Sequence, residues 1–534
     1  MTRSHTFRPT RLRLALALAG VVGALAACAV GPNYHPPKSA PPDLYAGAPG
    51  AVGTTKPAAA TAPAANVAAP PAADPAVWWR SLQDAELDSL VERALAGNMS
   101  LEIALTRLQE ARTFEMALTG YALPRIDAGA GGGRGTGSDL TRGRVAAPLG
   151  SADHTLASAQ HLTSIAGGYA LWDIDLFGKL RRQIEAARYD AQAAAAARDA
   201  VQVAVIADLV RAYVDLRGLQ MQLAVLQQSQ AAAKSLLDLV QARFERGITN
   251  ELDLTLARRQ YATVQASIAP LDAQVHAAQY AIAVLLGRYP EEMVKELGAP
   301  ALIPAIPSQA PAGVPLDLLR RRPDIRAAEW ELAAATARIG VATANLFPQL
   351  SLGAGLGVQS EGFGYQPAGR QRIWSAGYTA VLPLLDFGTL DALVSVADLQ
   401  THERLLDYRR TVQSAVAEVD TAMVSFQAQQ ERQAALGEAV AASQRAMELA
   451  SQRYDRGLSD FLNVIDAQRQ AYDLEGQYVQ AQTAAAEQFV GLYRGLGGGW
   501  EQYAGPPALP MPQPAVVAAL RRLVSPVNSA PLTD

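Results

Sequence analysis

The sequence predicts an α+β membrane protein that uses one structural unit twice, each unit joining long helices to membrane-spanning β-strands. The second half of the chain repeats the first: residues 243–250 (RFERGITN) match residues 453–460 (RYDRGLSD) at an offset of 210. Residues 178–246 run for 69 residues without proline, which is typical of one very long helix. Four glycine-rich segments of roughly ten residues each partly alternate with apolar residues, as membrane-spanning strands do.

The N-terminus is typical of a bacterial lipoprotein. In residues 1–27 four arginines precede an apolar run, as in a secretory signal peptide, and the run ends in Leu-Ala-Ala-Cys28. Cys28 is the only cysteine of the chain, so no disulfide within the chain is expected, and we expect it to carry N-palmitoyl and S-diacylglycerol groups. Ala29, where an aspartate would retain the protein, favours sorting to the outer membrane. Residues 28–76 then form a lipidated N-terminus and a Pro/Ala-rich linker, and residues 504–534 a Pro-rich, disordered tail.

The charge and the hydropathy of the sequence argue against binding to nucleic acid and against a membrane-crossing helix. The formal net charge is −4, and no basic stripe is present that would indicate binding to nucleic acid. No apolar run approaches the twenty residues that a membrane-crossing helix needs. Any crossing is therefore expected to use strands.

Each repeat is expected to contain a helix, a strand, a loop, a strand, a very long helix, a tip and a returning helix. The first repeat spans residues 77–300, with strands at about 124–135 and 163–174 and a hairpin tip near residue 247. The second spans residues 301–503, with strands at about 348–358 and 374–384 and a tip near residue 457.

Prolines and glycines mark the transitions between these elements. Pro124 and Pro348 are expected where a helix becomes a strand, because proline disfavours helix in the residue before it. Gly178 and Gly388 are expected where the second strand of each pair becomes the long helix.

The expected length of the long helix can be compared with the lengths of the shorter helices. A helix over residues 178–246 would be about 100 Å long, and its apolar residues follow a heptad spacing that predicts coiled-coil packing. The return path over residues 249–289 would be about 60 Å, and a further helix over residues 316–346 about 45 Å. We expect these two shorter helices to stack and to match the long one.

The strand count predicts a homotrimer. Four strands cannot close a barrel, and open sheet edges are not tolerated in lipid. Three chains would supply twelve strands and a closed pore. The alternative interpretation is a soluble helical protein with two glycine-rich hairpins.

The two tips are candidate functional sites. Gly247 and Gly457 can take the left-handed conformation that ends a helix, and Thr249 or Ser459 can cap the next one. Charged and aromatic side chains of the second tip could close a pore when three copies surround an axis, or could be ordinary solvated charges. The candidate gate residues are Arg453, Tyr454, Asp455, Arg456, Asp460 and Asp466. The candidate docking residues, which could equally seal the hairpins internally, are Gly247, Ile248, Thr249, Leu252, Gly457, Leu458, Ser459 and Leu462.

Four motifs carry a resemblance to a known family. Residues 28–37, 172–179, 453–470 and 493–500 resemble the outer membrane factors of tripartite efflux systems, in the OprM/NodT-type lipoprotein branch of the TolC superfamily. The resemblance covers nearly all of residues 28–503. It implies a trimeric channel-tunnel with a twelve-stranded outer membrane β-barrel continuous with a long periplasmic α-helical barrel. It also implies that the second tip lies on the inner pair of helices.

The predicted function follows from this resemblance. We expect a passive exit duct for drugs or other small toxic molecules, with a periplasmic adaptor docked at the tips and a pump of the RND type in the inner membrane. No cofactor, metal site or enzymatic activity is expected: the six histidines form no pair at ligand spacing, and no phosphate-binding loop is present. The alternatives are the outer membrane conduit of a type I protein secretion system and a structural lipoprotein without a conducting role.

Overall fold

The computed structural model describes residues 29–37, 74–136, 160–307, 321–363 and 369–501. Cys28, the signal peptide and the 504–534 tail, together with most of the linker, lie outside the described residues. The chain divides into two compact units. The first comprises residues 1–37, 110–193 and 328–408, and the second comprises residues 38–109, 194–327 and 409–534.

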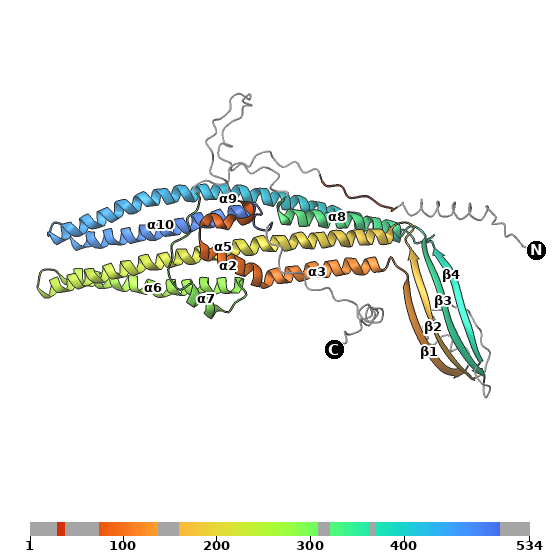
Figure 1. The fold of residues 1–534 in the computed structure, drawn as a ribbon. Helices are drawn as coiled ribbons and strands as arrows, with labels where there is room; N and C mark the ends of the chain where they lie inside the picture. The colour runs from red at the N-terminus through yellow and green to blue at the C-terminus, as the bar shows by residue number, and fades with distance from the viewer. Residues whose placement is uncertain (1–28, 38–73, 137–159, 308–320, 364–368, 502–534) are drawn as a thin grey trace, which may run out of the picture. The chain divides into compact units, whose positions relative to one another are not determined.

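The first unit contains one antiparallel sheet of four strands, in which sequence order and spatial order coincide (Figure 1). The strands are β1 (Arg125–Thr136), β2 (Gln160–Ile174), β3 (Gln349–Phe363) and β4 (Gly369–Val381). The pairing of β2 with β3 joins the two halves of the chain. β1 and β4 are the outer strands, and each has one edge that pairs with no other described strand.

The strands differ from their expected bounds at several ends. β2, β3 and β4 include residues beyond the expected ranges on the side of the hairpin loops, because ladder pairing continues there. The expected end of the last strand at residue 384 was wrong, since β4 ends at Val381. Pro383 has no backbone N–H to donate to a ladder, which explains why pairing stops before it.

Cross-strand register divides the side chains of the sheet between two faces. Trp172, Leu352 and Tyr378 are register partners, and residues two positions apart on each strand share their face. This face is apolar over most of its length: Ile126, Ala128, Ala130, Ala166, Ala170, Trp172, Ile174, Leu350, Leu352, Ala354, Leu356, Val358, Trp374, Ala376, Tyr378 and Ala380. The opposite face carries mostly glycine and polar residues, together with the apolar Leu171, Ile373 and Val381; its glycine and polar residues include Asp127, Asp173, Ser351, Gly353, Gly355, Gly357, Gln359, Ser375, Gly377 and Thr379.

The helices occur in pairs of equal length at corresponding places in the two halves. Two have 67 residues, α5 (Lys179–Glu245) and α9 (Thr389–Asp455); two have 35, α6 (Glu251–Leu285) and α10 (Phe461–Gly495); and two have 22, α3 (Met99–Gly120) and α8 (Pro323–Ala344). The remaining helices of the described residues are η1 (Pro75–Leu82), α2 (Ala85–Gly97) and α7 (Pro290–Glu296). Among the described residues, no helix is both long and apolar enough to cross a membrane.

The stacking of the shorter helices differs from the expectation. The expected partner of the 249–289 helix was the helix over 316–346, which corresponds to α8 in the structure; residues 316–320 lie outside the described residues. Instead, the end of α6 meets the start of α3, where Asn98 Nδ2 donates to Leu285 O at 2.7 Å. The end of α10 meets the start of α8, where Arg322 Nη1 donates to Gly495 O at 2.5 Å. Each returning helix therefore meets the short helix that precedes the strands of its own repeat.

The core of the second unit lies where η1 and α2 pack on the long helices. Trp78 is almost fully buried and stacks on Tyr493 with ring centroids 5.3 Å apart. Arg217 of α5 is also buried, pairs with Glu86, and donates to Ala299 O at 2.9 Å. Burial of this charge is tolerated because its two terminal nitrogens, Nη1 and Nη2, meet a carboxylate, a carbonyl and an amide oxygen.

Candidate functional site

The two tips have the same backbone conformation at the end of the long helix. Gly247 and Gly457 have φ values of +69° and +73°, the left-handed conformation expected of them. The N–H of the residue after each glycine donates back into the preceding helix, from Ile248 to Arg243 O at 2.9 Å and from Leu458 to Arg453 O at 2.8 Å. Each long helix therefore ends abruptly and its partner returns beside it.

The caps of the returning helices lie one residue beyond the expected positions. Asn250, not Thr249, caps α6, with its side chain accepting from the Asp253 N–H at 2.9 Å. Thr249 donates instead to the Asp253 carboxylate at 2.6 Å. At the second tip Asp460 occupies the cap position without a side-chain cap bond, and Ser459 accepts from Asn463 Nδ2 at 3.0 Å.

The tips are linked by a contact that we call the tip clamp, formed by Arg243 of α5 with Tyr454 and Asp455 of α9. Arg243 Nη2 donates to Asp455 Oδ1 at 3.3 Å, and its guanidinium lies 4.7 Å from the centre of the Tyr454 ring. Tyr454 in turn packs against Phe461 at 5.5 Å. Two of the expected gate residues thus contact the other hairpin, and their partner Arg243 was not among the expected residues.

Of the other gate candidates, Arg453 and Asp466 make contacts within the second hairpin. Arg453 Nη2 donates to Leu458 O at 3.4 Å, and Arg456 is exposed in the turn. Asp466 accepts from Gln470 at 3.0 Å and lies 3.9 Å from Arg469, both on its own helix. Asp460 is the N-cap residue, immediately before α10 begins at Phe461. Their role in closure stays a prediction.

The docking candidates divide by exposure. Ile248, Leu252, Leu458 and Leu462 are exposed and occupy corresponding positions in the two tips. The interior of the tips is sealed by a separate cluster of buried residues: Val240, Leu254, Ala257, Phe461 and Ile465. The buried cluster thus consists of different side chains from the four exposed ones, whose role in docking stays a prediction.

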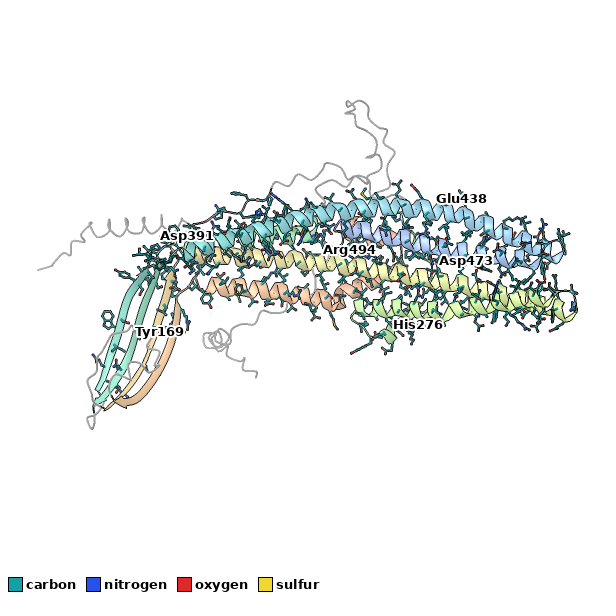
Figure 2. The ribbon with its side chains drawn as sticks, turned by 180° about the vertical axis from the view of Figure 1, so that it is seen from behind. Tyr169, His276, Asp391, Glu438, Asp473 and Arg494 are labelled. Atoms are coloured by element: carbon teal, nitrogen blue, oxygen red, sulfur yellow. The ribbon has the colours of Figure 1, made fainter. Side chains whose placement is uncertain are left out.

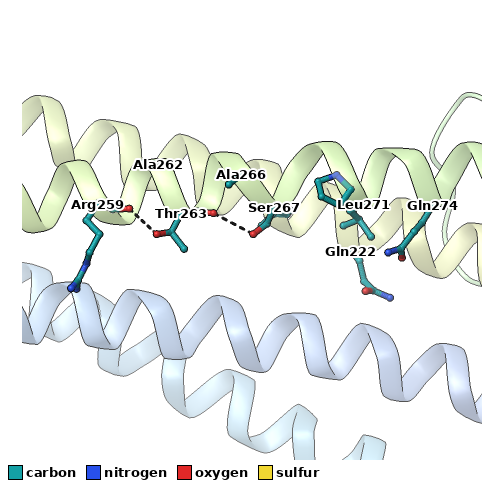
Figure 3. Close-up of a pocket in the computed structure, with 10 residues that line it drawn as sticks. Gln222, Arg259, Ala262, Thr263, Ala266, Ser267, Leu271 and Gln274 are labelled. Carbon is teal, nitrogen blue, oxygen red and sulfur yellow. Dashed lines mark hydrogen bonds between the residues drawn. The ribbon is translucent and has the colours of Figure 1, made fainter.

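A groove of about 880 Å³ runs along α6 (Figure 3). It is lined by Gln222 and Leu226 of α5 and by Arg259, Ala262, Thr263, Ala266, Ser267, Pro270, Leu271 and Gln274 of α6. Gln222 at its wall accepts a hydrogen bond from Gln480 of α10 at 3.4 Å. Pro270, which lies inside α6, has no N–H to donate to the carbonyl four residues earlier.

The four transition residues lie where they were expected. Pro124 and Pro348 immediately precede β1 and β3, and Gly178 and Gly388 precede α5 and α9 with φ values of +81°. The helix start at Gly388 is fixed by Asp386, whose carboxylate accepts from the Leu390 N–H at 2.8 Å.

The aromatic residues beside these glycines are covered unequally. Phe177 stacks on Phe347 with centroids 4.8 Å apart. Phe387, the corresponding residue of the second repeat, is 90% exposed. Leu123, which corresponds to Phe347, is 68% exposed. The contact between Phe177 and Phe347 is thus made within the chain, whereas the corresponding side chains of Phe387 and Leu123 are exposed.

The polar face of the sheet carries charges near its helical end. Arg125 and Asp127 form an ion pair at 2.7 Å, and Ser351 donates to Asp173 at 2.6 Å. Tyr169, labelled on β2 in Figure 2, shares this face with Asp127, its register partner. The arrangement provides fixed charge and hydrogen-bonding groups along one side of the sheet.

Two half-buried carboxylates lie in the second unit, on α5 and α10. Burial raises the pKa of Asp215 above its ordinary value. Burial, reinforced by the charge of Asp215, raises the pKa of Glu487, and Arg211 opposes this shift. Among the described residues, no three His, Cys, Asp or Glu side chains are grouped as a metal site.

Comparison with known proteins gives one consistent match. The family model described as "Outer membrane efflux protein" matches residues 90–288 and 314–498. Nodulation protein T of Rhizobium leguminosarum bv. trifolii is 29% identical over 484 residues, covering 90% of this chain and 96% of that protein. The pyoverdine export outer membrane protein OpmQ of Pseudomonas putida is 31% identical over 433 residues, covering 79% and 88%. The solved structure of the outer-membrane channel OprN is similar with a TM-score of 0.76 and 32% identity, covering 89% of this chain and 100% of that one.

Proposed function

Because the chain belongs to the outer membrane efflux protein family, we propose that it is the exit duct of a tripartite efflux pump for small toxic molecules. It has the α+β fold of the TolC-like channels and acts in the outer membrane. Conduction is passive, with energy supplied by an inner membrane pump, and no catalytic step is assigned to the chain.

The observation that carries the proposal is the two-faced sheet. An apolar face that includes Leu352, Leu356 and Trp374 suits contact with lipid, and a face of glycines and polar groups suits a water-filled pore. Charges at the helical end of the polar face would line the pore where the sheet gives way to helix. Fixed charges in that position influence which ions pass.

The proposed assembly is a homotrimer. The free edges of β1 and β4 must be paired in lipid, and β4 of one copy next to β1 of another would satisfy both. This pairing would also bring Phe387 onto Leu123 of the partner subunit, repeating between copies the Phe177–Phe347 contact made within one. Burial of these exposed side chains favours the assembly.

The tip clamp is the proposed closure of the periplasmic end. Arg243 links the two hairpins of one chain, so breaking this link lets the second hairpin move relative to the first. Each link is weak, since it combines an exposed ion pair with a cation–π contact. Three copies acting together would give a closure that an adaptor can open.

A periplasmic adaptor is the proposed partner at the tips. The exposed leucines and isoleucine at positions 248, 252, 458 and 462 recur at corresponding places in both hairpins, so three chains would present six similar apolar surfaces. The groove along α6 extends this surface with polar groups. An RND-type pump would complete the assembly in the inner membrane.

Lipidation of Cys28 completes the proposal. The cysteine follows the apolar signal run, and the acyl chains would add membrane affinity to that of the strands. Mass spectrometry of the N-terminal peptide tests this directly. An unmodified thiol on the exported protein would remove the lipid anchor from the proposal.

The channel is tested by conductance. The purified protein, with its oligomeric mass determined on the same sample, is inserted into planar bilayers. A trimer that gives discrete channels supports the duct, and a folded monomer without channels contradicts it. Cysteines introduced by Leu123→Cys and Phe387→Cys, each in a different copy, should cross-link only if the proposed strand pairing forms. Single variants serve as controls.

The type I secretion alternative concerns cargo rather than the channel. Loss of the gene with the pump and adaptor present should raise sensitivity to small molecules if efflux is the function. Retention of a protein substrate in the cell with unchanged sensitivity would instead favour protein export.

A further inference from the structure

A cavity of about 590 Å³ is lined by α5 and α8 in the first unit. Its volume is within the range of pockets that hold small ligands. At 1.5 Å per residue, the cavity extends no more than about 20 Å along α5 from Lys179, the first residue of that helix after β2. Its lining includes Arg181, Glu185, Arg188, Tyr189 and Gln192 of α5 and Trp330 of α8.

The cavity carries one positive charge without a counterion. The charges of two lining residues are paired, since Arg181 Nε lies 3.3 Å from Asp175 Oδ2. Likewise, Glu185 Oε2 lies 2.7 Å from Arg182 Nη1. Arg188 is exposed and, among the described residues, has no carboxylate within ion-pair distance. An anionic group of a ligand would therefore find a free guanidinium here.

The same cavity contains a buried acceptor without a donor. Gln192 Oε1 is buried and accepts no hydrogen bond from any described residue. An unpaired buried polar atom lowers stability, so a ligand that donates to this oxygen is favoured. Gln192 follows Arg188 by four residues, which places it about 6 Å further along α5. The cavity thus offers a cation and an acceptor at a fixed spacing.

Aromatic rings form another part of the wall. Tyr189 stacks on Trp330 with ring centroids 5.7 Å apart, and its hydroxyl donates to Glu185 at 3.4 Å. The faces of such rings attract cations. A cationic group of a ligand beside Gln192 would therefore meet both an acceptor oxygen and aromatic rings.

The order of these groups along α5 matches the order of groups in a phospholipid. The end of α5 beside the sheet is its N-terminus, so Arg188 lies nearer the sheet than Gln192. On the sheet, exposed Trp172 and Tyr378 are typical of the boundary between membrane and water. A phospholipid phosphate lies nearer the acyl chains than the terminal ammonium of an ethanolamine headgroup. Two carbons join these groups, and they can span about 6 Å along a helix.

We propose that this cavity binds the headgroup of a zwitterionic phospholipid whose phosphate carries ethanolamine. Arg188 binds the phosphate, and Gln192 Oε1 accepts a hydrogen bond from the ammonium, which also contacts the aromatic rings. A choline headgroup has no N–H to donate, so the site distinguishes ethanolamine from choline. The proposal depends on the outer membrane location of the chain and not on its role in conduction.

The test is native mass spectrometry of the purified full-length protein with added lipids of identical acyl chains. Phosphatidylethanolamine should bind about tenfold more tightly than phosphatidylcholine, because only its ammonium donates to Gln192. Arg188→Ala should weaken the binding of phosphatidylethanolamine by about tenfold. Equal binding of the two lipids, or unchanged binding in Arg188→Ala, overturns the proposal.

Arg112→Ala is the matched control. Arg112 is an exposed arginine of α3, eight residues before Gly120, and Arg188 lies nine residues after Lys179. The two arginines are therefore at similar distances from the sheet ends of their helices, but Arg112 does not line the cavity. Arg112→Ala should leave lipid binding unchanged. A loss equal to that of Arg188→Ala would show unspecific attraction of lipid to arginine and would overturn the site.

Gln192→Leu tests the ammonium contact separately from folding. It replaces an unpaired amide by an apolar side chain of similar size, so the temperature of thermal unfolding should not fall. Binding of phosphatidylethanolamine should fall to the level of phosphatidylcholine, and a preference that survives overturns the assigned acceptor. Inorganic phosphate, added at the concentration of the lipid, should leave lipid binding unchanged. Displacement of the lipid by this phosphate would assign the cavity to a soluble anion and overturn the headgroup.

Discussion

Arg243 of α5 and Asp455 of α9 join the two hairpin tips, with Nη2 3.3 Å from Oδ1. The residues are 212 positions apart, and each lies near the end of a 67-residue helix. The guanidinium also covers the ring of Tyr454, so one side chain makes both contacts of the tip clamp. Arg243 is therefore the residue whose removal should release the clamp most completely.

Replacing Arg243 by alanine should raise single-channel conductance and open probability. The ion pair and the cation–π contact together contribute about 1–2 kcal/mol per chain, which corresponds to roughly tenfold in the release of the clamp of each chain. Arg246→Ala is the matched control, since it removes an exposed arginine from the same turn. Equal conductance of the two variants would show that the clamp does not close the channel.

Alanine at the tip glycines should destabilise the hairpins. Gly247 and Gly457 have positive φ, so Gly247→Ala and Gly457→Ala should each cost about 1 kcal/mol. Gly476 lies inside α10 with nothing within 4 Å of an added Cβ, and Gly476→Ala should stabilise by about 0.5–1 kcal/mol. The temperature of thermal unfolding should thus fall in Gly247→Ala and Gly457→Ala and rise in Gly476→Ala. A stabilising effect at either tip would contradict the assigned turn.

Arg322 should be essential to the joint between α10 and α8. It donates to Gly495 O and pairs with Asp324 and Glu418 at 2.8 Å each. Arg322→Met leaves these partners without their cation and should lower the free energy of unfolding by about 3 kcal/mol.

The control for this joint is Arg494, labelled in Figure 2, which pairs with Asp208 at 3.3 Å on the surface. Arg494→Met should cost under about 1 kcal/mol. Denaturant unfolding in detergent measures the free energy of unfolding of both variants. Similar losses in the two variants would mean that Arg322 gives the joint no special stability.

Arginine substitutions should distinguish the two faces of the sheet. Leu356→Arg places a charge on the apolar face and should cost about 2–4 kcal/mol of membrane insertion. Ser375→Arg, on the neighbouring strand but the polar face, should insert normally and alter ion selectivity. For both variants, the yield of folded protein in liposomes measures insertion, and the reversal potential measures ion selectivity. Normal insertion of Leu356→Arg would contradict its contact with lipid.

Stability should fall as pH rises through the raised pKa values of Asp215 and Glu487. Both carboxyls have folded pKa values above their unfolded values near 4, so the folded state holds its protons more tightly. Their stabilising contribution is complete below about pH 4 and is lost above the raised values. Asp215→Asn with Glu487→Gln should therefore be more stable than the natural protein at pH 7, with the gap closing towards pH 4. Asp473→Asn, which changes an exposed carboxylate of α10, is the matched control.

Local rules allowed much of the fold to be predicted from the sequence. Pro124, Pro348, Gly178 and Gly388 mark transitions because proline and glycine restrict or free the backbone of their immediate neighbours. The same rule could have ended the last strand before Pro383. The caps were misplaced by one residue at the tips, since Thr, Ser, Asn and Asp all serve there and the sequence does not distinguish neighbours of similar propensity.

The sequence by itself determined the order of the elements, the repeat motifs at the tips and the family, because these depend on residues close together in the chain or on matched motifs. Only the tertiary structure decided which helix ends meet. It also revealed that Arg243 contacts the second tip and that Arg182 donates to Val30, Gly31 and Asn33 near the N-terminus. These contacts join residues about 150 to 210 positions apart. They depend on the relative packing of long helices, and no local propensity encodes which charged side chain of one helix will face which residue of another.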